Sequence, residues 1–158
     1  MKRPLQTALA GTSAAALFAM MVLTFADVFA RKFLPSSLTG AVELTELLMT
    51  VMIYCALPLA SLAGEHIVFD LFDRMVPAAV LRWQHRLSHA VTALVFLGAG
   101  WLVWQRALRT LGQGDQTATL EITISPFQFG AAALLALTAL MHVWLAWRAE
   151  AKAKDETA

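Results

Sequence analysis

The sequence predicts an all-α polytopic membrane protein with four transmembrane helices, and two observations carry this prediction. First, four stretches contain no Asp, Glu, Lys or Arg over at least 18 residues: 4–26, 47–64, 87–105 and 122–147. A helix rises about 1.5 Å per residue, so about 20 apolar residues cross a hydrocarbon core of about 30 Å. Second, hydrophobic residues make up 59% of the 158 residues and charged residues 15%, against about 45–50% and about 25% in soluble domains. A soluble protein of this size could not bury so much apolar surface.

Charge clusters and turn residues divide the chain into spans of about 6–28, 42–63, 87–105 and 125–147, which we expect to form one membrane domain over residues 1–158. Lys2 and Arg3 precede the first span, as in a signal peptide. The apolar segment that follows has about 23 residues, whereas the apolar core of a signal peptide has about 7–15. No convincing small-x-small cleavage site follows it. We therefore interpret it as an uncleaved first helix.

The distribution of Lys and Arg predicts that both termini are cytoplasmic. With both termini inside, the inner segments hold eight basic residues and the outer segments hold four. The inner set is Lys2, Arg3, Arg74, Arg82, Arg86, Arg148, Lys152 and Lys154, and the outer set is Arg31, Lys32, Arg106 and Arg109. Cytoplasmic loops of membrane proteins carry the excess of basic residues. Tryptophans at the ends of the third and fourth spans agree with the boundaries, since indole rings prefer the headgroup level.

The inner loop between the second and third spans has the pattern of a short amphipathic helix lying in the headgroup plane. Its apolar residues recur at spacings of three and four, with Asp70, Asp73 and Arg74 between them and Pro77 at the end. The apolar set is Ile67, Val68, Leu71, Phe72, Met75 and Val76. An apolar face with charges on the opposite side is typical of an interfacial helix.

Acidic residues gather at the outer ends of the first two spans. Asp27 lies near the end of the first span, and Glu43 and Glu46 open the second. Arg31 and Lys32 are near enough in sequence to pair with them, so the cluster could lock the two spans together. Acids in the first turn of a helix are also favoured by the helix dipole and need no special function. Both interpretations are compatible.

Small residues recur at helical spacing in the first span, among them Ala8, Gly11 and Ala15. Small side chains let helices approach closely in lipid. The stripe could serve internal packing, and with only four helices to pack, it could also dock another protein.

Other classes of function have less support. The sequence shows no nucleophile constellation, phosphate loop or metal-ligand spacing, so we expect no catalytic or metal site. The net charge of +1 and the lack of a basic tract argue against nucleic acid as a partner. The single cysteine, Cys55, is expected to be a packing residue. A stand-alone small exporter driven by protons would need an ionisable group deep in the bilayer, and each candidate acid lies near a span end.

Two histidines leave an alternative open. His89 and His142 are expected at similar depth in the inner leaflet. They could ligate a b-type haem, as in the membrane anchor subunit of a respiratory enzyme. Each could equally bond a headgroup, a carbonyl or a partner subunit.

Four motifs in order resemble a known family. They are Asp27-Val28-Phe29-Ala30-Arg31, Thr39-Gly40-Ala41-Val42-Glu43-Leu44, Gly64-Glu65-His66-Ile67-Val68-Phe69-Asp70 and Thr123-Ile124-Ser125-Pro126-Phe127. In order and spacing they are similar to the small, DctQ-like membrane subunit of tripartite ATP-independent periplasmic (TRAP) transporters. The resemblance covers nearly the whole chain.

The resemblance implies a bacterial inner-membrane subunit that binds no cofactor or substrate and performs no chemistry. Its implied partners are membrane lipids, a large membrane subunit that carries the sodium and solute sites, and a periplasmic binding protein that delivers an organic acid. Within such a subunit we expect Arg31, Glu43 and Glu46 to hold the first span to the second or to contact the large subunit. His66, Asp70 and the apolar face Ile67–Met75 would seat the interfacial helix.

Overall fold

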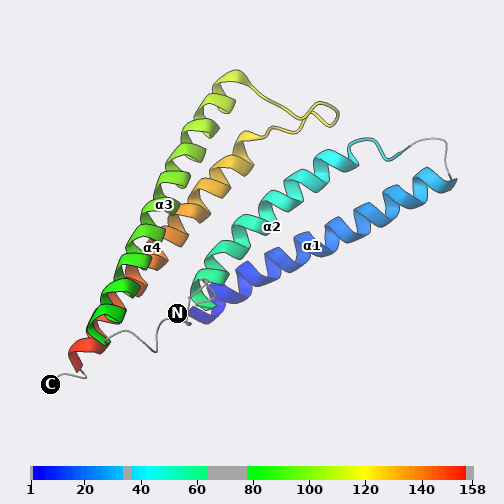
Figure 1. The fold of residues 1–158 in the computed structure, drawn as a ribbon. Coiled ribbons are helices and arrows are strands. Elements are labelled where there is room, and N and C mark those ends of the chain that lie inside the picture. The colour runs from blue at the N-terminus through cyan, green and yellow to red at the C-terminus, as the bar shows by residue number, and fades with distance from the viewer. Residues whose placement is uncertain (1, 34–36, 64–77, 156–158) are drawn as a thin grey trace.

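Four long helices make up the protein in the computed structural model, which describes residues 2–33, 37–63 and 78–155 (Figure 1). The helices are α1 (Lys2–Phe33), α2 (Ala41–Ala63), α3 (Ala78–Gln113) and α4 (Ser125–Asp155). Strand pairing in the described residues is limited to one isolated bridge between Gln116 and Thr123. The predicted all-α class is confirmed. The predicted interfacial helix, with His66, Ile67, Asp70, Leu71, Phe72 and Met75, lies outside the described residues.

Each helix contains a segment long and apolar enough to cross a membrane. These segments are Pro4–Phe33, Ala41–Ser61, Arg86–Gln113 and Ser125–Trp147. The four predicted spans are therefore present, and the chain is a multi-pass membrane protein. The first, third and fourth helices extend further than the predicted spans: α3, predicted over 87–105, begins at Ala78 and ends at Gln113, and α4, predicted over 125–147, continues to Asp155. In the part of α3 that follows residue 105, Ala107, Leu108 and Leu111 favour helix, and no Pro or Gly interrupts it before Gly112.

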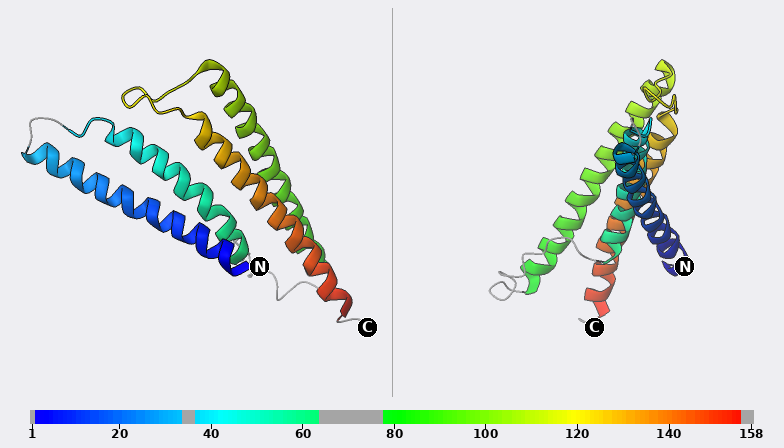
Figure 2. Two further views of the ribbon diagram at one scale, coloured as in Figure 1. Left: turned by 180° about the vertical axis from the view of Figure 1, so that it is seen from behind. Right: turned by 90° about the vertical axis from the view of Figure 1, so that its right-hand side faces the viewer.

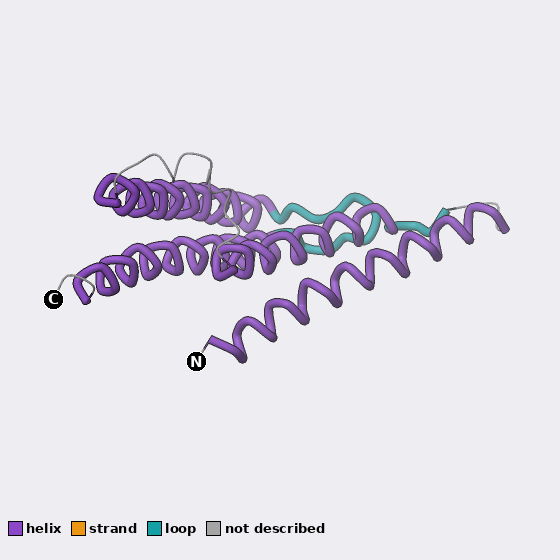
Figure 3. The backbone as a smooth tube through the Cα atoms, turned by 60° about the horizontal axis from the view of Figure 1, so that its bottom comes forward, coloured by secondary structure: helices purple, strands orange, loops and turns teal. Residues whose placement is uncertain are grey.

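The helices pack side by side in the order α1, α2, α4, α3. Contacts join α1 to α2, α2 to α4 and α4 to α3, and within residues 2–33, 37–63 and 78–155 no other pair of helices packs together. Figure 3 shows α1 and α3 on opposite sides, with the other two helices between them. The start of α1 and the end of α4 lie at one end of the molecule, which we call the terminus end (Figures 1 and 2). The end of α1, the start of α2 and the segment between α3 and α4 lie at the other, the hairpin end.

Small side chains line the interfaces between helices. Ala107 and Ala139 are fully buried, and a Cβ on Gly100 would lie 3.4 Å from Cβ of Leu135. Helices in lipid associate by such close van der Waals approach, since lipid tails remove the hydrophobic drive that operates in water. The large apolar side chains point outward instead, for example Phe25 at 69% exposure and Leu94 at 71%. Small side chains between the helices and large apolar side chains on the outside suit a protein that is surrounded by lipid hydrocarbon.

Candidate functional site at the hairpin end

The segment between α3 and α4 is an ordered hairpin, which we call the α3–α4 hairpin (residues 114–124). The amide of Thr117 donates to the carbonyl of Ile122 at 3.0 Å, and the amide of Ile124 donates to the carbonyl of Asp115 at 3.4 Å. The Thr117 hydroxyl accepts from the amide of Ile122 at 3.1 Å. In Figure 1 this hairpin reaches across from α3 and α4 toward the start of α2.

Glu43, in the first turn of α2, holds the tip of this hairpin. Its Oε1 accepts the backbone N–H of Thr119 at 2.7 Å, and its Oε2 accepts the N–H of Leu120 at 3.0 Å. Hydrogen bonds to an ionised carboxylate are shorter and stronger than neutral ones. The contact joins residues 76 and 77 positions apart. It therefore connects the α1–α2 pair to the α3–α4 pair at the hairpin end.

A glycine permits this contact. Gly40 precedes α2 with a φ of +80°, a conformation that residues with a Cβ rarely adopt. A Cβ at this position would lie 2.5 Å from Cγ of Leu120. Both the turn and the close approach of the hairpin therefore require glycine here. Sequence reasoning assigned no contact to Thr119 and Leu120; the Gly40-Ala41-Val42-Glu43 motif was the available signal.

Asp27 joins the end of α1 to the chain that leads into α2. Its Oδ2 accepts from Arg31 Nε at 2.9 Å and lies 2.8 Å from Arg31 Nη2. Its Oδ1 accepts the backbone N–H of Leu38 at 2.9 Å. The carboxylate thus satisfies a backbone donor that has left the helix, and Arg31 orients the carboxylate from one turn away.

The predicted acidic and basic residues therefore divide into two centres rather than one cluster. Asp27 and Arg31 are brought together, and Glu43 bonds the hairpin instead of Arg31. Glu46 is exposed and makes no side-chain hydrogen bond or ion pair to another described residue. Lys32 lies 5.9 Å from the centroid of the Phe33 ring.

The small-residue stripe on α1 faces outward. Gly11 and Ala15 are exposed, and nothing lies within 4 Å of a Cβ built on Gly11. Contact with α2 falls instead on the neighbouring face, where Ala16 is buried and the Ser13 hydroxyl lies 3.4 Å from the carbonyl oxygen of Met52. Gly11 and Ala15 are thus available to a partner.

At the terminus end, hydrogen-bonded polar side chains link α2, α3 and α4. His142 of α4 is fully buried, its Nε2 lies 3.1 Å from Ser61 Oγ of α2, and its Nδ1 lies 3.3 Å from His89 Nδ1 of α3. The Phe96 ring stacks on His142, with centroids 5.8 Å apart. His89 and His142, which were expected at similar depth, thus lie side by side. Their ring nitrogens are in direct contact, so no porphyrin fits between them, as axial ligation from opposite faces would require.

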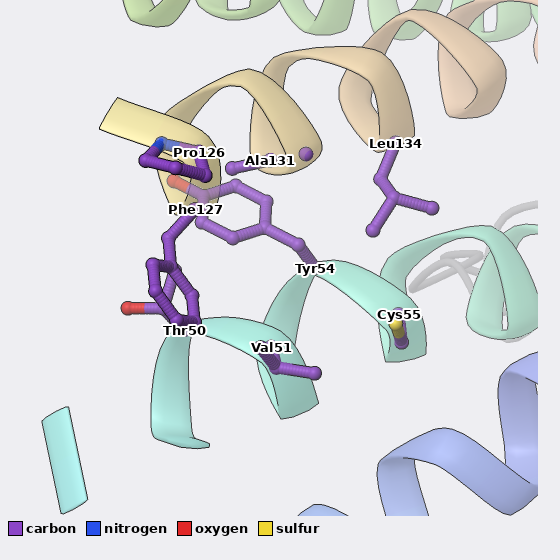
Figure 4. A pocket seen from close by; sticks show the side chains of 9 residues that line it. Thr50, Val51, Tyr54, Cys55, Pro126, Phe127, Ala131 and Leu134 are labelled. Carbon is purple, nitrogen blue, oxygen red and sulfur yellow. The ribbon is translucent and has the colours of Figure 1, made fainter. Parts of the chain in front are cut away.

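A small apolar pocket of about 240 Å³ lies between α2 and α4 (Figure 4). Tyr54 extends from α2 toward Pro126 of α4, and Cys55 and Leu134 also line the pocket. The lining offers no pair of acids or bases to do chemistry. Among the described residues, no group of three or more His, Cys, Asp or Glu side chains could hold a metal ion.

Two comparisons with known proteins bear on this arrangement. A family model described as the DctQ component of tripartite ATP-independent periplasmic transporters matches residues 20–149. The matched segment contains both Asp27 and Glu43 with their partners. A search of curated proteins finds no match to the chain.

Proposed function

The chain belongs to the DctQ family of TRAP transporters, and we propose that within such a transporter it is a non-catalytic brace for the large membrane subunit. Members of this family are small membrane components that work in tripartite systems with a large membrane subunit and a periplasmic binding protein. The proposed brace would widen the fixed part of the transporter while the large subunit moves sodium and an organic acid.

The observation that carries this proposal is the single-file packing of the helices. Among the four described helices, α1 packs against α2 alone and α3 against α4 alone, so each presents a long apolar side to its surroundings. A closed bundle would bury these sides against each other. A row of helices that is held together at both ends could pack along another membrane protein and extend it in the plane of the membrane.

A non-catalytic role is supported by the positions of the polar groups. Asp27 and Glu43 are engaged in holding backbone N–H groups, and His142 bonds Ser61 inside the row. Many secondary transporters build the solute site from discontinuous helices near the midplane of the membrane. Here each of the four described helices is continuous.

We further propose that both termini are cytoplasmic in a bacterial inner membrane. The excess of Lys and Arg in the segments on the terminus side supports this orientation. The α3–α4 hairpin would then face the periplasm, where it is positioned to help dock the binding protein.

The test compares Glu43→Ala with Glu46→Ala in cells that express the whole transporter. Glu43 holds the hairpin, whereas Glu46 is exposed one helical turn away, so the pair matches in charge and differs in contact. We expect Glu43→Ala to reduce co-purification with the large subunit and solute uptake, while solute binding by the isolated periplasmic protein stays normal. Wild-type assembly and uptake in Glu43→Ala would contradict the bracing role.

A further inference from the structure

An apolar groove of about 710 Å³ runs along the face shared by α3 and α4. Its lining includes Leu94, Gly98 and Trp101 from α3 and Ala132, Ala133 and Ala136 from α4. A Cβ built on Gly98 would meet nothing within 4 Å. The small residues thus leave a surface groove between the two helices.

Two arginines stand at the hairpin end of this groove. Arg106 and Arg109 line an adjoining hollow that shares Trp101 with it. Gly98, Gln105 and Arg109 lie seven and eleven residues apart, about two and three helical turns, so they share one stripe of α3. Neither guanidinium makes an ion pair with a carboxylate in the described part of the chain.

The depth of the arginines fits the headgroup level. Gly100 packs beside Ala132 and Leu135, and the antiparallel course of the helices then places Arg109 near the first residues of α4. From Arg109 to Leu94 the stripe measures about 22 Å along the helix. Half of a hydrocarbon core is about 15 Å, and one headgroup layer adds about 5–8 Å. The charged hollow and the groove together match the length of one leaflet.

We propose that this surface binds an anionic phospholipid, with its phosphate at Arg106 and Arg109 and an acyl chain in the groove. Arginine binds phosphate oxygens in a bidentate geometry, which gives the headgroup a specific partner. The indole N–H groups of Trp101 and Trp104 make no hydrogen bond to described residues and stand at the same end of the groove. A partner helix seated here would place hydrocarbon side chains against the groove and leave two guanidinium groups to be satisfied separately. A phospholipid satisfies both parts at once.

The test measures lipid binding to the purified full-length chain by native mass spectrometry, with phosphatidylglycerol and phosphatidylcholine as probes. The double variant Arg106→Gln/Arg109→Gln removes the charge, and Gly98→Leu fills the groove without meeting another atom at its Cβ. The matched controls are Lys32→Gln, an exposed basic residue at the same end, and Gly11→Leu, an equally open glycine on α1. Both test variants change exposed positions, and a circular dichroism melt confirms that each folds.

We expect the double variant to bind phosphatidylglycerol about 25-fold more weakly, about fivefold per arginine. Gly98→Leu should weaken it as well, and both controls should bind as the wild type does. Equal binding of the two lipids, or no effect of either test variant, would overturn the proposal. A second test places a photo-crosslinker at Leu97 in membranes that hold the whole transporter. Labelling of a protein and of no phospholipid would also overturn the proposal.

Discussion

The two ends of the helix row are held by different chemistry. At the hairpin end, ionised carboxylates of Asp27 and Glu43 accept backbone N–H groups from loops. At the terminus end, the buried groups that join α2, α3 and α4 are Ser61, His89 and His142. A carboxylate can remain charged where water and headgroups reach it, whereas an ion deep in the row would lose its hydration. Hydroxyl and imidazole groups join helices without a fixed charge.

The largest effect is expected from His142→Ala. The change removes a fully buried ring and leaves Ser61 and His89 without this partner. We expect a loss of about 3 kcal/mol in unfolding free energy, because a cavity and unsatisfied polar groups are created together. Thermal unfolding in detergent measures it, with Val143→Ala, an exposed neighbour, as the control. Equal melting of the two variants would show that the histidine does not hold the helices.

Glu43→Gln tests the carboxylate contact at the hairpin end. The amide keeps the size of the side chain but offers one acceptor oxygen to two N–H donors. We expect hydrogen exchange at the amides of Thr119 and Leu120 to become at least about tenfold faster. Exchange at the buried segment around His142 should stay unchanged. Unaltered exchange at the hairpin would mean that the carboxylate contact does not order it.

Gly40→Ala tests whether the hairpin must approach α2 closely. The left-handed backbone conformation costs a residue with a Cβ about 1–2 kcal/mol, and the new Cβ would overlap Leu120. We expect lower stability and faster exchange at Thr119. Adding Leu120→Ala should restore the stability that is lost through overlap with the Leu120 side chain, and not the stability that is lost through the backbone conformation. The matched control is Gly112→Ala, inside α3 with open space beside it.

Arg31→Ala should have the smallest effect on stability. The Arg31 side chain is 59% exposed, and exposed ion pairs contribute little to stability. Asp27 would keep the Leu38 N–H. We expect the rate of hydrogen exchange at the Leu38 amide to change by about twofold at most, and by less at high salt. A collapse of the hairpin in this variant would show that the two centres at the hairpin end act as one.

The sequence predicted a good part of the candidate site and missed its main contact. Asp27, Arg31 and Glu43 were identified because charged residues near membrane spans are rare enough to stand out. The partner of Glu43 was not predicted, since Glu43 was expected near Arg31 and instead accepts two backbone N–H groups of residues that precede α4. Backbone donors are the same in every residue, so no sequence pattern marks them.

The number and approximate positions of the membrane-spanning helices were determined by the sequence alone, because the length and polarity of each segment decide whether it can cross hydrocarbon. Only the tertiary structure decided the order of the helices, the outward direction of Gly11 and Ala15, and the meeting of His89 with His142. These depend on which faces touch, and apolar helices in lipid have many faces of similar polarity. Close packing of small residues then selects among them, and that selection depends on distances in space that the sequence does not contain.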